Sequence, residues 1–177
     1  MNMPASASLT NQPLQADAHA LPCERGVAAK GAAQAVVLDT NIALDVLLFQ
    51  NPDAEPLRAA LQAGRVQWLR TTRMREELQR VLAYPHIAAR LLFHQRAASQ
   101  IMAQYDAWTV PVDAAPRCAY ICKDADDQCF IDLAVARHAL LVSKDAQVLK
   151  LRKRLAKIGI KVCRQLLPAS WPDALPG

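Results

Sequence analysis

Four acidic side chains, far apart in the sequence, are candidates for one chemical site. Asp39 ends the apolar run AVVL, and Asp145 comes two residues after the apolar run ALLVS. If both runs are buried strands of a parallel sheet, both carboxylates lie at its carboxyl edge, where the functional groups of such folds gather. Capping of the next helix would explain either aspartate alone, because Asp is a favoured N-cap residue.

A third acid comes from the segment TTRMREELQRVL. Its apolar residues recur at helical spacing and predict a buried stripe of Met74, Leu78, Val81 and Leu82. Glu77 lies along this stripe, whereas Glu76 points away from it and has Arg73 and Arg80 at ion-pairing distance along the helix. Because a carboxylate held toward the apolar side needs a partner, Glu77 is the candidate of the two.

The fourth acid, Asp127, opens the predicted helix DQCFIDLAVARHA and shares a face with its apolar residues. Asp127 is therefore predicted to point toward the sheet. Asp132 is turned about 140° away and is predicted to face partly into solvent. Asp124 and Asp126 precede the helix and could cap it, and Asp124 could also reach into the site.

Four carboxylates gathered in a cleft of low dielectric constant repel one another, so they must be protonated or neutralised by a cation. Oxygen ligands without His or Cys suit hard cations, here Mg²⁺ or Mn²⁺. Such a site is suited to phosphoryl chemistry. The spacing along the chain leaves open whether one or two metal ions bind.

The charge distribution is compatible with a polyanionic partner, although charge alone favours a simpler explanation, a solvated helix face. The net charge is +5, and residues 146–167 contain seven basic residues and no acidic one. A basic surface beside an acidic focus could hold a polyanion near a bound cation.

The order of the segments predicts a single α/β domain. Apolar runs predict strands at residues 35–39, 65–70, 140–143 and 160–163. Helical patterns occupy residues 41–49, 53–64, 72–84, 87–108, 127–139 and 146–159. Apolar strands separated by helices predict a parallel sheet between two helical layers.

The two ends of the chain fall outside this pattern. Residues 1–34 are rich in Ala, Ser, Gln and Pro and are predicted to be a disordered extension, whereas residues 168–177 form a proline-rich, irregular tail. The predicted domain spans residues 35–167. No membrane span or secretory signal is recognisable, so we expect a cytoplasmic protein without a membrane partner.

With these residues in place, the chain resembles the PIN-domain family, specifically the bacterial group assigned as toxin components of toxin–antitoxin systems. The resemblance covers residues 35 to about 167. VVLDTNIALDVLL is similar to the first motif of the family, with Asp39 as its acid and Asn41 as a supporting polar residue. TTRMREELQRVLAYPHI is similar to the second motif, in which Thr71 takes the hydroxyl position and Glu77 the acidic one.

Two further motifs follow in the family's order. CKDADDQCFIDLA resembles the third, with Asp127 as the acid and Asp124 as an accessory. LLVSKDAQVL resembles the fourth, with Asp145 after a strand and Ser143 at a hydroxyl position. The family more often has Gly or Arg at the place of Lys144 and Thr at that of Ser143, and neither departure removes a metal ligand.

The resemblance implies a three-layer α/β/α fold with a four- or five-stranded parallel sheet. It also implies an Mg²⁺- or Mn²⁺-dependent ribonuclease that hydrolyses single-stranded RNA. Asp39, Glu77 and Asp127 would hold or orient the metal, and Asp145 would complete the cluster and position the attacking water. Asn41, Thr71, Asp124 and Ser143 would support these acids. The expected phosphate contacts are Lys144, Lys150, Arg152, Lys153 and Arg154.

The family resemblance also suggests a cognate antitoxin that blocks the cleft. A homodimer could form through the apolar residues of segment 87–105, although burial of these residues within their own domain is an alternative. A catalytically silent PIN-like module that binds RNA or protein would be the main alternative to an enzyme. A phosphatase with an aspartyl nucleophile is less suitable, because Asn41 stands where that chemistry places a general acid.

Overall fold

The computed structural model describes residues 33–165. Residues 1–32 and 166–177 lie outside the described part. They include most of the predicted extension, the last two residues of the predicted domain, and the predicted tail. Within residues 33–165, no helix is long and apolar enough to cross a membrane.

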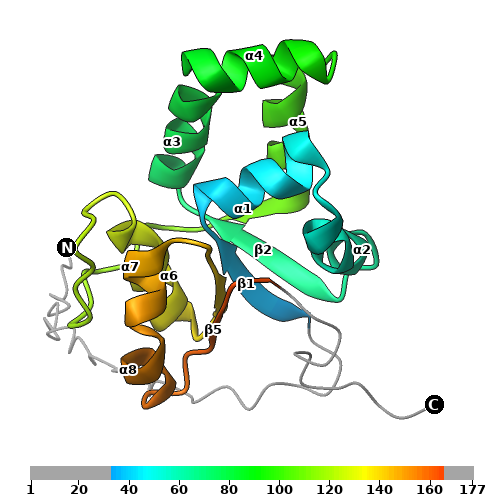
Figure 1. Ribbon diagram of the computed structural model, residues 1–177. Coiled ribbons are helices and arrows are strands. Elements are labelled where there is room, and N and C mark those ends of the chain that lie inside the picture. Colours follow the sequence, from blue (N-terminus) through cyan, green and yellow to red (C-terminus); the bar gives the residue numbers. More distant parts are fainter. Residues whose placement is uncertain (1–32, 166–177) are drawn as a thin grey trace, which may run out of the picture. The chain divides into compact units, whose positions relative to one another are not determined.

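The centre of the fold is a parallel sheet of five strands, in the spatial order β3-β2-β1-β4-β5 (Figure 1). The strands are β1 (Gln34–Leu38), β2 (Val66–Arg70), β3 (Thr109–Pro111), β4 (Leu140–Val142) and β5 (Val162–Cys163). Val36 of β1 lies opposite Trp68 of β2 and Leu140 of β4. The predicted fold class, a three-layer α/β/α arrangement around a parallel sheet, is confirmed.

Helical segments connect the strands and cover both faces of the sheet (Figure 1). They are α1 (Thr40–Leu44), η1 (Asp45–Phe49), η2 (Pro52–Ala54), α2 (Glu55–Gln62), α3 (Thr72–Leu82), α4 (Pro85–Phe93), α5 (Ala98–Trp108), α6 (Gln128–Arg137), α7 (Ala146–Lys150) and α8 (Arg152–Ala156). η1 is a π-helical turn and η2 a 3-10 turn.

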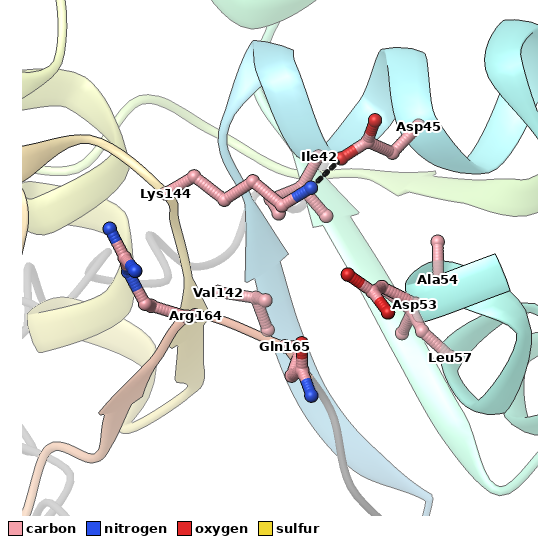
Figure 2. A pocket seen from close by; sticks show the side chains of 9 residues that line it. All are labelled: Ile42, Asp45, Asp53, Ala54, Leu57, Val142, Lys144, Arg164 and Gln165. Carbon is pink, nitrogen blue, oxygen red and sulfur yellow. Dashed lines mark hydrogen bonds and ion pairs between the residues drawn. The ribbon is translucent and has the colours of Figure 1, made fainter. Parts of the chain in front are cut away.

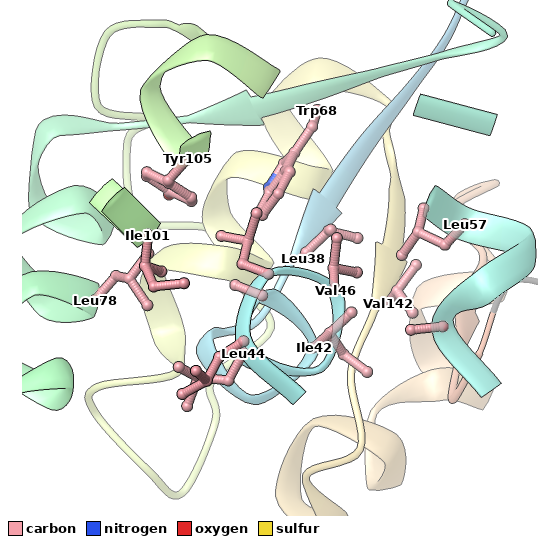
Figure 3. Close-up of a cluster of buried hydrophobic side chains, with 14 of the residues drawn as sticks. Leu38, Ile42, Leu44, Val46, Leu57, Trp68, Leu78, Ile101, Tyr105 and Val142 are labelled. Carbon is pink, nitrogen blue, oxygen red and sulfur yellow. The ribbon is translucent and has the colours of Figure 1, made fainter. Parts of the chain in front are cut away.

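Each face of the sheet has its own apolar core. Val36 and Leu38 pack with α1, α2 and α5 on one side, where Trp68 and Tyr105 meet edge to face at 5.0 Å between ring centroids (Figure 3). Val37 and Leu141 pack with α6, α7 and α8 on the other side. This alternation follows from the two-residue period of a strand, and it explains why β1 from Ala35 onward and the whole of β4 are apolar.

The order in which successive strands are added to the sheet reverses at β1, and this reversal positions the acids. Strands β2 and β3 extend the sheet on one side of β1, whereas β4 and β5 extend it on the other. In open α/β sheets the crevice at such a switch point, outside the carboxyl ends of the strands, is where ligands bind. Asp39 directly follows β1, and Ser143 directly follows β4.

Several elements differ from the predicted ones, and each of the predicted helices 41–49 and 53–64 includes a turn of another helical type, η1 and η2. The predicted helix 87–108 is two helices, because Gln95 adopts a left-handed conformation (φ 51°) and Arg96 N–H donates to the Leu91 carbonyl, which closes α4 in a Schellman turn. The predicted helix 146–159 is likewise divided at Leu151 into α7 and α8. Strand β3 was not predicted; it has three residues, includes a proline and lies at the edge of the sheet, the position where a strand tolerates proline.

Candidate active site

Asp39 is a buried carboxylate at the carboxyl end of the central strand. Its Oδ1 accepts a hydrogen bond from Ile42 N–H at 2.8 Å and so caps α1, and its Oδ2 accepts one from Lys144 N–H at 3.2 Å. Its exposed fraction is only 2 %. Burial raises the pKa of Asp39, bonds from Ser143 and the two backbone groups act in the opposite direction, and the charge of Asp145 raises it further.

The loop after β4 brings Ser143 and Asp145 to the same place. The Ser143 hydroxyl is completely buried, bonds to Asp39 and accepts from Asp145 N–H at 3.0 Å. Asp145 caps α7 through bonds from Gln147 N–H at 2.6 Å and Val148 N–H at 3.3 Å. The capping explanation is therefore correct for both Asp39 and Asp145, and it does not exclude their charges from acting on a common site.

Glu77 reaches the same edge from α3. Its Oε1 accepts a hydrogen bond from the Thr40 hydroxyl at 2.7 Å, and the side chain is half-buried, whereas Glu76 is exposed. Burial raises the pKa of Glu77, the bond from Thr40 lowers it, and the charge of Asp126 raises it. Helix α3 contacts both α1 and α6, which explains how one residue of α3 can face acids from two other segments.

Asp127 shows most clearly how the acids are related. Its pKa is raised from 3.8 to about 7, first by burial and then by the charges of Asp145, Asp124, Asp39 and Glu77. Although it directly precedes α6, its side chain makes no capping hydrogen bond. The carboxylates of four separate chain segments thus act electrostatically on one group.

The donor set suits a hard divalent cation, because the acids offer carboxylate oxygens and their mutual repulsion would be relieved by positive charge. Within residues 33–165, no three His, Cys, Asp or Glu side chains are grouped closely enough to hold a metal ion as they stand. Binding of a cation would therefore require these carboxylates to move closer together.

The predicted supporting residues occupy different environments. Thr71 is buried and caps α3 by accepting from Met74 N–H at 3.4 Å. Asn41 is exposed in the first turn of α1. Asp124 is exposed, and its Oδ1 accepts from Asp126 N–H at 2.9 Å. Ser143 is the one of the four that bonds to a predicted acid.

The predicted phosphate contacts also separate into groups. The Lys144 ammonium forms an ion pair with Asp45 of η1 (Figure 2). Lys150 donates to the Gln147 side chain at 3.1 Å, and the Arg154 guanidinium lies over the Tyr120 ring at 5.5 Å from its centroid. Arg152 and Lys153 are exposed and line a groove beside β5.

The predicted partial exposure of Asp132 is wrong. This carboxylate is only 8 % exposed and accepts from Cys118 N–H at 2.9 Å and from Gln128 Nε2 at 2.8 Å. Gln128 in turn accepts from Cys122 N–H at 2.7 Å and donates to the Tyr120 carbonyl at 3.1 Å. Asp132 therefore holds the irregular segment before α6 in place. The end of this segment contains Asp124 and Asp127.

The sequence argument also missed Thr40 and Asp45. Thr40 lies between Asp39 and Asn41 in the first motif and orients Glu77, and Asp45 neutralises Lys144. A hydroxyl directly after a strand-ending aspartate is a signal for Thr40. The polar Asp45 within the apolar run IALDVLL is a corresponding signal for a buried ion pair.

Comparison with known proteins identifies the family. A family model described as "PIN domain" matches residues 35–147. The chain belongs to the PIN-domain family. This PIN domain is also similar to a chain in the crystal structure of VapBC2 from Rickettsia felis bound to a DNA fragment from their promoter, with a TM-score of 0.51 and 15 % identity over 73 % of this chain and 97 % of the other. That likeness concerns the fold alone, and a comparison with curated proteins found no match.

The raised pKa of Asp127 predicts how stability depends on pH without metal. Below about pH 4 the group is protonated in both folded and unfolded chains. As the pH rises toward 7, the unfolded chain releases this proton and the folded chain keeps it, so the free energy of unfolding should fall. Urea unfolding in EDTA at several pH values measures this loss, and Asp127→Asn should reduce it. Equal pH dependence in Asp127→Asn and in the exposed-acid control Asp113→Asn would contradict the prediction.

Proposed function

We propose that this PIN domain is an Mg²⁺- or Mn²⁺-dependent endoribonuclease that hydrolyses phosphodiester bonds of single-stranded RNA, as the toxin component of a toxin–antitoxin system. PIN domains are in general nucleases, which supports the reaction class. The strongest support from the structure is that the charges of Asp39, Glu77 and Asp145 all act on Asp127. Acids that repel one another at the switch point of a parallel sheet are suited to binding a cation and a phosphodiester together.

Each acid has a role in this proposal that follows from its surroundings. Asp39, Glu77 and Asp127 would hold the cation, and Asp145 would complete the cluster and orient the attacking water. A bound divalent cation would supply a Lewis acid that lowers the pKa of a water molecule and offsets charge on the phosphodiester. Ser143 fixes Asp39 through its hydroxyl and accepts from Asp145 N–H, so one buried side chain sets the relative position of two acids.

The two alternatives lack comparable support. A catalytically silent module has no need of acids from separate segments whose charges add to the effect of burial in raising the pKa of Asp127. An aspartyl phosphatase would need an acid at position 41, where the chain has an exposed asparagine.

The toxin assignment has independent, weaker support. The VapBC2 structure contains a chain with this fold. We propose that the present chain has a protein partner too, an antitoxin whose segment covers the acids. We further propose that α4 contributes to a homodimer, because Leu92 and Phe93 are 80 % and 75 % exposed at its carboxyl end. Large apolar side chains with this degree of exposure can take part in a protein interface.

Cleavage of RNA should require Glu77 and not its neighbour. Glu77→Gln removes a charge from the proposed metal site, and we expect a loss of at least about 100-fold in cleavage rate, since even supporting residues of metal sites contribute about 10- to 100-fold. Glu76→Gln removes an exposed charge from the same helix and should retain activity. The measurement is cleavage of a fluorescent single-stranded RNA in Mn²⁺, Mg²⁺ or EDTA. Undiminished cleavage in EDTA, or equal rates for both variants, would refute the metal mechanism.

Expression of the chain in a bacterial host should arrest growth if its target is cellular RNA. The arrest should be lost in Asp39→Asn, because this change weakens the proposed metal site while the amide oxygen can still accept one of the two backbone hydrogen bonds. Growth curves after induction, with protein levels matched by immunoblot, provide the measurement. Equal arrest by the wild type and by Asp39→Asn would exclude RNA cleavage as its cause.

The proposed homodimer should depend on the exposed end of α4. Leu92→Ser/Phe93→Ser removes two apolar side chains that make little contribution to the domain's own core. We expect the variant to be monomeric by light scattering at concentrations where the wild type is dimeric. Ile158→Ser, at another partly exposed apolar residue, is the control and should leave the mass unchanged. A monomeric wild type at high concentration would rule out the dimer.

A further inference from the structure

The basic residues at the carboxyl end of the described chain line a groove. It lies beside α8 and β5 and has a volume of about 580 Å³. Its basic residues are Arg152, Lys153, Lys161 and Arg164, and the rest of its lining is Ala, Val, Cys and Gln, with no acidic side chain among these described residues. The groove therefore surrounds its space with positive charge. This space can hold a ligand much larger than a single ion, such as part of a nucleotide chain.

The groove is continuous with the carboxyl edge of the sheet. Cys163, at the end of β5, accepts a hydrogen bond through its carbonyl from Ser143 N–H at 2.9 Å. Arg164 follows Cys163 and lines both the groove and a small neighbouring pocket that includes Lys144 (Figure 2). The N–H of Lys144 donates to Asp39. Arg164 thus lies between the basic groove and the loop that holds the acids.

The surroundings of the other basic residues determine which of them can serve a ligand. Lys144 is neutralised by Asp45, Lys150 bonds to Gln147, and Arg154 lies over Tyr120. These three have protein partners, so a ligand would have to compete for them. Arg152 and Lys153 are exposed and face the groove, and guanidinium groups such as those of Arg152 and Arg164 match the geometry of phosphate oxygens.

We propose that the groove between α8 and β5 binds the sugar–phosphate backbone of single-stranded RNA on one side of the bond to be cut, with Arg164 as the last contact before the acids. This proposal rests on the proposed function. It resolves an electrostatic conflict, since clustered carboxylates repel a polyanion and the substrate needs attraction from a separate surface. It also replaces Lys144, Lys150 and Arg154 as phosphate contacts with Arg164, beside Arg152 and Lys153.

The test is the salt dependence of RNA binding. Binding of a fluorescent single-stranded RNA of about 12 nucleotides is measured by anisotropy in EDTA, over a range of salt concentrations. Each phosphate contact contributes about 0.7 to the slope of log affinity against log salt for single strands, so Arg152→Gln/Lys153→Gln/Arg164→Gln should reduce the slope by about 2. Arg90→Gln/Arg117→Gln/Arg137→Gln removes the same charge at exposed positions outside the groove and should leave most of the slope intact.

The outcomes separate this proposal from that of the enzyme. Equal slopes for the two triple variants, or a wild type that does not bind RNA, would overturn the groove. A poly-glutamate peptide that competes as well as RNA of equal charge would identify the groove as a site for acidic protein segments and would also overturn it. Binding that depends on the groove without any metal-dependent cleavage would support the groove and refute the enzyme. In an active enzyme, the groove variant should lose much more of its cleavage rate on long RNA than on a dinucleotide, because a dinucleotide reaches few of the groove's contacts.

Discussion

Asp39 carries a carboxylate into the interior at the end of the central strand, where hydrogen-bond donors must offset the loss of water. Two of these donors are backbone N–H groups from opposite ends of the domain sequence, Ile42 at the start of α1 and Lys144 after β4. The Ser143 hydroxyl is the third. Any change in how β4 pairs with β1 would remove the second and third donors together. The register between β4 and β1 therefore also determines the position of the site.

Strand and acid positions could be predicted because they depend on local pattern. Val36 and Leu141 lie in short apolar runs, and a polar signature at the end of each run marks the carboxyl edge. Strand β3 could not be predicted in this way, because three residues at a sheet edge have no period and follow directly on a helix. The end of α4 was missed for a different reason. Gln95 forms its left-handed turn in place of the usual glycine, so the sequence shows no break.

The features of the site that could not be predicted from the sequence depend on contacts between distant segments. Helical geometry predicted partial exposure for Asp132, but the irregular segment before α6 covers this carboxylate, and no periodicity can reveal such a contact. The prediction of Lys144 as a phosphate contact rested on its charge alone. Its partner Asp45 lies 99 residues earlier in the sequence. Thr40 was hidden between two residues of a recognised motif. In each case, the partner was determined by tertiary packing and could not be read from spacing.

The hydrogen bond from Lys144 N–H to Asp39 spans 105 residues, and this separation has a consequence for how the protein is made. Such a contact cannot form before both segments have been synthesised, and closing the long intervening loop costs conformational entropy. A nascent polypeptide that ends before β4 contains Asp39 and Glu77 and still lacks the loop that fixes them. Incomplete translation products and fragments cut upstream of β4 therefore lack the assembled centre. Whatever chemistry the acids perform begins only when synthesis of the domain is nearly complete.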